Sequence, residues 1–234
     1  MPISIKAFIY LLMSSVILMS CTEAETTGKT YTGKRKKIAF YETYEVQEIK
    51  PVIMQASLEC VDIPENSINV MYFENLLTWG EGAQIAYVDS VNFNYVDSVL
   101  KTECSTTILP TDLRFLWSEK SFDMGIKDKR HYMLYAIKNP ISGPTITNKH
   151  IKTSSVGFNY NNSEPSIQIE MTKQGADKWS EMTKNNLGRH IAMSVDGSVY
   201  SCPRVDGVIT GGYTEISGGL GLDEAKELAA AIGH

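Results

Sequence analysis

The sequence predicts an α+β fold in which helices pack on a mixed or antiparallel sheet. Apolar and polar residues alternate at Ile167–Met171 and again at Ile191–Val195, which is the pattern of half-buried strands. The segment between these strands has the spacing of an amphipathic helix, and Asp196-Gly197 follows the second strand as a hairpin turn. Strands interleaved with helices and joined by a tight turn are typical of this fold class.

Two helices are predicted in the C-terminal third. Thr172 is expected to cap the first helix, and Gly188 to end it as the C′ residue. The second is expected over Leu222–Ile232, with Gly221 as the N-cap and Glu224 at the third helical position. The side chains expected on their buried faces are Ala176, Trp179, Met182 or Thr183, and Leu187 in the first helix, and Ala225, Leu228, Ala229 and Ile232 in the second.

Shorter patterns predict the elements of the N-terminal half. Strands are expected at residues 38–41, 85–88, 114–117 and 131–137, the last of them ended by Asn139-Pro140. A helix is expected over Val46–Leu58, with Pro51 in its first turn or at a kink. Another is expected through Val91, Tyr95 and Val99, capped by Asp89 or Ser90. Residues 61–82 show no clear period and are interpreted as a loop, and Pro110-Thr111-Asp112 as a turn.

The first twenty residues have the character of a secretory signal. Lys6 precedes the apolar run Ala7–Met19, which is shorter than a bilayer-spanning helix and is interrupted only by Ser14 and Ser15. Leu18-Met19-Ser20-Cys21 resembles the lipobox of bacterial lipoproteins, so we expect lipidation at Cys21; signal cleavage that leaves an ordinary thiol is the alternative. The expected location is the bacterial envelope, at the periplasmic face or the cell surface.

Charge and cysteine content limit the remaining functions. The formal net charge is −5, which argues against a nucleic-acid partner, and the basic run Lys34–Lys37 is interpreted as part of a solvated tether. Three cysteines follow Cys21, so an oxidising compartment allows one disulfide and one free thiol. Cys60 and Cys104 both lie in the N-terminal half, which favours their pairing.

No catalytic constellation stands out. Ser201-Cys202-Pro203 lacks both glycines of a nucleophile elbow and falls at the end of a predicted hairpin strand. The acidic pairs Asp123 with Asp128 and Glu42 with Glu45 are interpreted as solvated surface. His131, His150 and His190 have no metal-ligand spacing. We therefore expect a protein that is not an enzyme and that has no metal or cofactor.

The stretch GADKWSEMTKNNLGRHIAMSVDGSVYSCPRVDGVITGG, followed by ISGG and DEAKELAAAI, resembles the first periplasmic domain of SecD and SecDF, subunits of the bacterial Sec translocase. IAFYETYEVQEIKPVI, DLRFLWSEK and YMLYAIKNP extend the resemblance to residues 37–232, with its weakest part at 61–82. The residues on the family pattern are Gly175, Ala176, Trp179, Thr183, Asn186, Gly188, Arg189, Ile191, Ala192, Asp196, Gly197, Val199, Ser201, Pro203, Ile209, Gly211, Gly212, Ile216, Gly218, Glu224, Ala225, Leu228 and Ala229.

The resemblance implies a domain organisation. We expect a lipoprotein signal peptide at residues 1–20, a flexible tether at 21–37, a partial base-like α+β region at 38–110 and a head-like domain at 111–233. Family members have transmembrane helices beside this domain with charged residues that couple translocation to the proton gradient. We expect no such helices in this sequence, so the resemblance does not imply proton-driven pulling here. Cys202 replaces the usual alanine, which indicates a thiol in a small-residue slot.

The resemblance also implies a function. In the family this domain is thought to contact the emerging preprotein, so the expected partners are unfolded or translocating polypeptide and Sec translocase subunits, with membrane attachment through the lipid. The alternative is a repurposed, species-specific interaction lipoprotein, such as an inhibitor or immunity-type partner, with no translocase role.

Lipidation of Cys21 gives the first testable prediction. Cys21→Ser is expected to release the protein from the membrane fraction, because the diacylglyceryl anchor attaches to this sulfur. Metabolic labelling with a palmitate analogue is expected to mark the wild type and not the variant. Equal labelling of both proteins would contradict the assignment.

Overall fold

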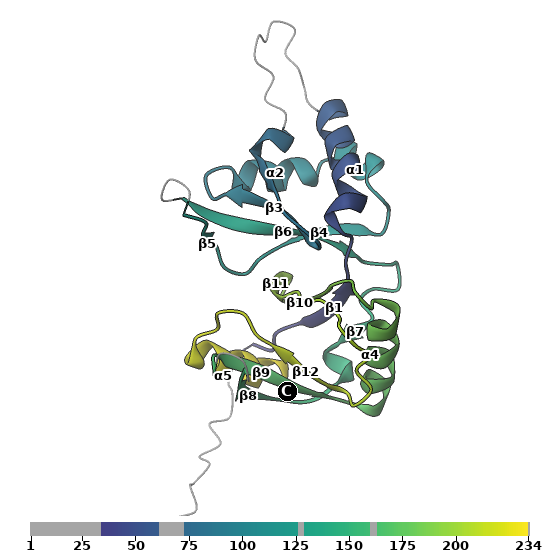
Figure 1. Ribbon diagram of the computed structural model, residues 1–234, viewed down its shortest axis with the longest axis vertical. Coiled ribbons are helices and arrows are strands. Elements are labelled where there is room, and N and C mark those ends of the chain that lie inside the picture. Colours follow the sequence, from purple (N-terminus) through teal and green to yellow (C-terminus); the bar gives the residue numbers. More distant parts are fainter. Residues whose placement is uncertain (1–33, 61–72, 126–128, 160–162, 234) are drawn as a thin grey trace, which may run out of the picture. The chain divides into compact units, whose positions relative to one another are not determined.

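Strands from both halves of the chain combine into three sheets that are antiparallel throughout (Figure 1). The computed structural model describes residues 34–60, 73–125, 129–159 and 163–233. All of them lie in the second of two units, Met1–Thr30 and Tyr31–His234. The predicted signal peptide, Cys21 and residues 22–33 of the tether lie outside the described residues. Within the described part, no helix has the length and apolar character needed to cross a bilayer.

The first sheet carries the helices of the N-terminal half. Its strand order is β2-β3-β6-β4, and β5 also pairs with β6. The strands are β2 (Leu77–Trp79), β3 (Gln84–Asp89), β4 (Leu113–Trp117), β5 (Phe122–Asp123) and β6 (Arg130–Lys138). The helices are α1 (Val46–Glu59), the 3-10 helix η1 (Phe73–Leu76), α2 (Phe93–Leu100) and α3 (Glu103–Ile108). Ile49 and Ile53 of α1 pack with Ile85 and Leu134 of the sheet in one buried cluster.

A disulfide closes the helical side of this sheet. Cys60 directly follows α1 and Cys104 lies in α3, and their Cα atoms are 5.6 Å apart. This is the pairing that the sequence favoured. The bond joins residues 44 positions apart, and such a cross-link restricts the unfolded chain and so favours the folded one.

The second sheet pairs the first described strand with strands from the second half of the chain. Its order is β11-β10-β1-β7, formed by β1 (Ile38–Glu42), β7 (Ile146–Thr147), β10 (Ile191–Val195) and β11 (Ser198–Ser201). In the antiparallel register of β1 and β10, Ile38 lies opposite Val195 and Phe40 opposite Met193. Ile38 and Phe40 are fully buried, and the Phe40 ring meets the Trp179 ring edge-on at 5.3 Å.

The third sheet has the order β12-β9-β8 and carries the last helix. Its strands are β8 (Ile151–Phe158), β9 (Pro165–Met171) and β12 (Tyr213–Ile216). Helix α5 (Leu222–Ile232) packs on β8 and β9, and the Ser154 hydroxyl donates to the Ala229 carbonyl at 2.6 Å. Helix α4 (Lys173–Asn185) follows β9, and the 3-10 helix η2 (Asn148–His150) precedes β8. The inward faces of the second and third sheets share one core with Trp179 of α4.

The helix limits follow from the local chemistry that the sequence predicted. The Thr172 side chain accepts the Gly175 N–H at 3.1 Å, and Glu224 accepts the Gly221 N–H at 3.3 Å. Both bonds satisfy backbone donors that the first turn of a helix leaves without a partner. The limits of α5 are those expected, and its predicted apolar stripe is buried.

The predicted hairpin joins β10 to β11. Val195 pairs with Ser198, which leaves Asp196 and Gly197 as a two-residue loop. Both have positive φ, +51° and +91°, as this type of turn requires. Asp196 tolerates the left-handed conformation because a short polar side chain can bond locally, and its carboxylate accepts the Lys37 N–H at 2.8 Å.

Several sequence expectations need correction. The strands at 167–171 and 191–195 were expected in one sheet, but they lie in different sheets. Gly188 follows the C-cap Asn186 by two residues, so it is not the C′ residue, and Leu187 is 52% exposed. Helix α2 begins at Phe93, because Asp89 bonds the Val91 N–H in a local turn and leaves the helix without that cap.

Other differences concern the N-terminal half. Pro51 lies inside α1 beyond its first turn. The expected loop at 61–82 contains η1 and β2 in its described part, and α3, β5, β7, β8 and β12 had no sequence prediction. Strand β3 pairs with β6, so the predicted domain limit between residues 110 and 111 is not a boundary between sheets.

Substitution at Gly197 tests the hairpin. Gly197→Val is expected to destabilise the protein by about 1–3 kcal/mol, because a β-branched residue resists φ of +91°. A Cβ at this position meets no atom within 4 Å, so the loss comes from the backbone alone. Gly207→Val is the matched control, since Gly207 also has open space around it but no positive φ. Equal thermal midpoints for the two variants would contradict the turn assignment.

Candidate functional site

Five residues of the family pattern line one groove beside α4: Trp179, Thr183, Ile191, Pro203 and Ile209. Trp179 and Thr183 of α4 and Ile191 and Met193 of β10 line one part of it. The segment Pro203–Ile209 and the β12 residues Thr214 and Glu215 complete the lining. The groove holds about 350 Å³, which is enough for apolar side chains of a bound molecule.

Trp179 forms the inner end of this groove. The side chain is 2% exposed, and its indole N–H has no hydrogen-bond partner among the described residues. A buried indole N–H normally finds an acceptor, because a lost hydrogen bond costs about 1–3 kcal/mol. The residues that line the groove therefore include one buried side-chain donor without a partner in the described part of the chain.

The wall formed by Pro203–Ile209 is fixed to the rest of the domain. Its first part runs beside residues 188–191: the Gly188 N–H donates to Val205 and the Val205 N–H donates to Arg189, both at 2.8 Å. Farther along, the Ile209 N–H donates to the Thr183 hydroxyl at 3.0 Å. Pro203 follows the end of β11 and accepts the Ile191 N–H at 3.2 Å. The groove is thus a preformed feature held by hydrogen bonds at both ends of its wall.

Strand β12 gives the groove an open edge. It is the outer strand of its sheet, and the Met171 N–H donates to the Gly212 carbonyl at 2.8 Å. Because backbone groups in an antiparallel ladder alternate in direction, Tyr213 and Glu215 direct theirs to the outer side. No backbone partner is given for these outward groups in the part of the chain that the structure describes. The Tyr213 side chain is 64% exposed.

The motif glycines have conformational and packing roles. Gly212 has a φ of +69°, and a Cβ there would lie 2.6 Å from the Ala176 Cβ. A Cβ on Gly175 would lie 2.3 Å from the His150 carbonyl oxygen, and a Cβ on Gly218 would lie 2.8 Å from the Tyr200 carbonyl oxygen. Gly211 has no comparable restriction, since its nearest neighbour is 3.6 Å away. These glycines let the backbone pass close to α4, η2 and β11.

Arg189 makes contacts on the other side of the motif region. Its guanidinium lies 2.6 Å from the Glu48 carboxylate and donates to the Thr43 carbonyl at 3.1 Å. Burial alone would raise the pKa of Glu48, but the hydrogen bonds from Arg189 and from the backbone lower it overall. His190 lies 3.2 Å from Glu45, whose side chain is almost fully buried. Arg189 therefore ties β10 to the start of α1.

Among the residues considered as catalytic candidates, only His190 and Glu45 lie within hydrogen-bond distance of each other in the described part of the chain, at 3.2 Å. Ser201 pairs with Met193 in the β10–β11 ladder, and Cys202 packs with Tyr135 and Ile137 of β6. Burial raises the pKa of the Cys202 thiol, which favours the unreactive protonated form. Among the described residues no group of three or more His, Cys, Asp or Glu could hold a metal ion. The absence of enzymatic activity and of a cofactor remains a prediction.

The other titratable candidates lie apart. His131 is in β6, His150 ends η2, and Asp123 is in β5, whereas Asp128 is outside the described residues. Burial lowers the pKa of His150, and its Nδ1 accepts the Thr147 N–H at 3.1 Å. Glu42 lies in β1 opposite Ile191. We therefore interpret these described residues as structural parts of the fold.

Comparison with known proteins assigns this part of the chain. Residues 126–233 match the family model described as SecDF, P1 head subdomain. This part of the chain is therefore similar to the SecD/SecDF head subdomain and is called the head-like domain below. The protein translocase subunit SecD of Magnetococcus marinus is 30% identical over 124 residues, which cover 53% of this chain and 22% of that protein. The SecD subunit of Acidaminococcus fermentans is 36% identical over 87 residues, covering 37% of this chain and 21% of that protein.

The matched segment spans about a fifth of the length of these relatives. A solved structure titled "Structure and function of a membrane component SecDF that enhances protein export" aligns with 84% of this chain and 92% of its own. Its TM-score is 0.38 at 17% identity, so the assignment rests on the sequence match. The groove between α4, β10 and β12 lies entirely within the head-like domain.

The family pattern in the sequence includes five of the residues that line the groove, but it does not predict the groove itself. Trp179, Thr183, Ile191, Pro203 and Ile209 are all motif residues, yet their proximity depends on the packing of two sheets. The outer edge of β12 was missed, although the alternation of Thr214 and Ile216 with Tyr213 and Glu215 is visible in the sequence.

The state of Cys202 yields a test of the nucleophile question. With Cys21→Ser in the chain and the Cys60–Cys104 bond intact, Cys202 is the single remaining thiol. Its reaction with a disulfide reagent near pH 8 is expected to be about 100-fold or more slower in the native protein than in urea, because burial disfavours the thiolate. Cys202→Ala is the blank. Equal rates in both conditions would show an accessible, activated thiol.

Proposed function

We propose that the head-like domain binds extended polypeptide in protein translocation at the bacterial envelope, with lipidated Cys21 as its membrane anchor. The observation that carries the proposal is the open edge of β12 beside the apolar groove. An unfolded chain has free backbone donors and acceptors that can pair with such an edge, and alternate side chains that can enter a neighbouring pocket. The relatives named translocase subunits support the translocation setting.

The geometry favours weak and sequence-tolerant binding. Pairing with Tyr213 and Glu215 uses only backbone groups of the client, so it does not depend on client sequence. The groove adds a preference for an apolar side chain near the paired segment. Ordering an unfolded client offsets much of the contact energy, so we expect dissociation constants in the micromolar range or weaker. Such binding suits contact with many exported proteins in succession.

Binding requires no bond breaking and no cofactor. The client's backbone hydrogen bonds replace those that the β12 edge makes with water, and apolar burial in the groove supplies a favourable term of about 25 cal/mol per Å². Sec translocase subunits are the further partners that we propose, on the basis of the relatives' names.

The proposal predicts the effect of proline on the outer edge of β12. Glu215→Pro removes one outward N–H and is expected to weaken client binding about tenfold, since a strand cannot pair fully without this donor. Glu215→Ala is the matched control: it also loses the side-chain bonds to Asn159 and Gln168 but keeps the N–H. Fluorescence anisotropy with a labelled secretory protein, denatured or folded, measures both.

The outcomes separate the candidate functions. The denatured client is expected to bind both the wild type and Glu215→Ala. The folded client is expected to bind neither protein. Equal weakening by both substitutions would assign the loss to the Glu215 side chain and contradict pairing through its N–H, and no weakening by either would place the client elsewhere. No binding of the denatured client to the wild type would favour the alternative of a species-specific interaction lipoprotein.

A further inference from the structure

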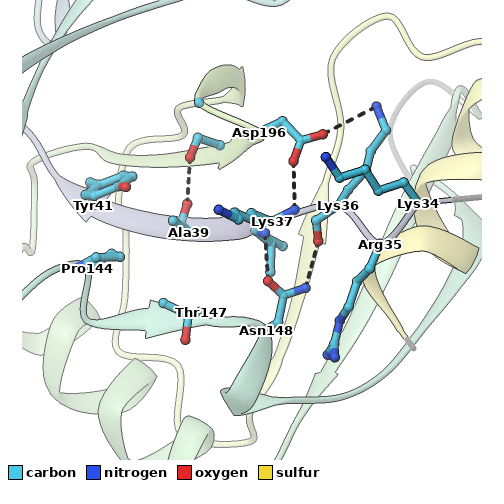
Figure 2. Close-up of a pocket in the computed structure, with 13 residues that line it drawn as sticks. Lys34, Arg35, Lys36, Lys37, Ala39, Tyr41, Pro144, Thr147, Asn148 and Asp196 are labelled. Atoms are coloured by element: carbon cyan, nitrogen blue, oxygen red, sulfur yellow. Dashed lines mark hydrogen bonds and ion pairs between the residues drawn. The ribbon is translucent and has the colours of Figure 1, made fainter.

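The basic run Lys34–Lys37 lies on the folded domain at the start of β1. It borders an open hollow of about 720 Å³ that also includes Tyr41, Thr147 and Asn148 (Figure 2). The sequence interpretation placed this run in a solvated tether. The structure corrects that interpretation for Lys36 and Lys37, because their backbone is bonded to the rest of the domain.

Side chains from two distant segments, η2 and the β10–β11 turn, fix this backbone. Asn148 donates to the Lys36 carbonyl at 2.9 Å and accepts the Ile38 N–H at 3.1 Å. The Asp196 carboxylate accepts the Lys37 N–H at 2.8 Å, and the Lys36 N–H donates to Ala231 at 3.2 Å. The side chains of Lys36 and Lys37 are therefore displayed from a fixed backbone segment just before β1, which lowers the conformational entropy lost on binding.

The charge at this hollow is one-sided. Of the described residues that line it, four are basic and one, Asp196, is acidic. The Lys36 ammonium lies 3.9 Å from that carboxylate, at the limit of an ion pair. A protein with net charge −5 thus keeps a local excess of positive charge here.

The directions of the side chains indicate an extended anionic surface. Lys36 reaches toward Asp196, whereas Arg35 runs away from it on the other side of the strand (Figure 2). One small anion cannot contact cations that diverge in this way, but a plane of headgroups can. Tyr41 in the same hollow adds an aromatic ring of the kind enriched at membrane interfaces.

We propose that Lys34–Lys37 and the adjoining hollow bind anionic phospholipid headgroups at a membrane surface. The proposal rests in part on the lipid anchor at Cys21, because residues 22–33 can span at most about 45 Å between the two sites. Each basic residue near an anionic surface contributes about 1 kcal/mol, so the run strengthens attachment and orients the domain on the bilayer.

Vesicle co-sedimentation of residues 21–234 carrying Cys21→Ser, which lack the apolar run Ala7–Met19, tests the proposal without the anchor. We expect binding to phosphatidylcholine vesicles with about one-third phosphatidylglycerol, loss of binding at high salt, and none to phosphatidylcholine alone. Combined Lys34→Gln, Arg35→Gln and Lys37→Gln is expected to lower the partition coefficient at least about tenfold. Lys36 is kept, since it neighbours Asp196.

The matched control removes the same charge elsewhere. Lys149→Gln, Lys173→Gln and Lys184→Gln neutralise three exposed lysines of the same domain and are expected to retain binding. An equal loss in this control, equal binding to neutral vesicles, or no binding to anionic vesicles overturns the proposal. Binding to soluble poly-glutamate without binding to anionic vesicles also overturns it and assigns an acidic polypeptide. Because Cys21 is absent in every arm, these results are independent of lipidation and of client binding.

Discussion

The pairing of β1 with β10 is the constraint on which the rest of the structure depends. β1 lies between β10 and β7, and its inward residues Ile38 and Phe40 enter the same core as Trp179. Full burial of such side chains stabilises the fold by about 1.5–3 kcal/mol each. The chain then passes through Thr43, which donates to the His190 carbonyl at 2.9 Å, directly into α1. One strand thus joins the core of the head-like domain to the helices of the N-terminal half.

This constraint also positions the two proposed binding surfaces. The inward face of β10 forms part of the groove that ends at β12, whereas the residues just before β1 carry the basic run. Asp196 links the two surfaces in the structure, since its turn follows β10 and its carboxylate accepts the Lys37 N–H. A client at β12 and a lipid surface at Lys34–Lys37 would use separate residues. The domain can therefore hold both ligands without competition for the same side chains.

The local elements could be predicted from the sequence, and the long-range packing could not. The Asp196-Gly197 turn and α5 depend on positive φ and on capping within a few residues, which a sequence pattern records. The pairing of Phe40 with Met193 joins residues far apart in the chain, and nothing in either strand names its partner. For the same reason two alternating strands were placed in one sheet, and the groove lined by Trp179 and Thr214 was missed. The basic run was misread because its fixing partners, Asn148 and Asp196, are distant in sequence.

Amide hydrogen exchange at β12 tests the central claim most directly. Saturation with a denatured secretory protein is expected to slow exchange at Tyr213 and Glu215, whose N–H groups face the open edge. Thr214 is expected to change little, because its N–H already faces β9 in the ladder. The folded client is not expected to slow exchange at Tyr213 or Glu215. Client binding that leaves both Tyr213 and Glu215 unprotected would contradict the account.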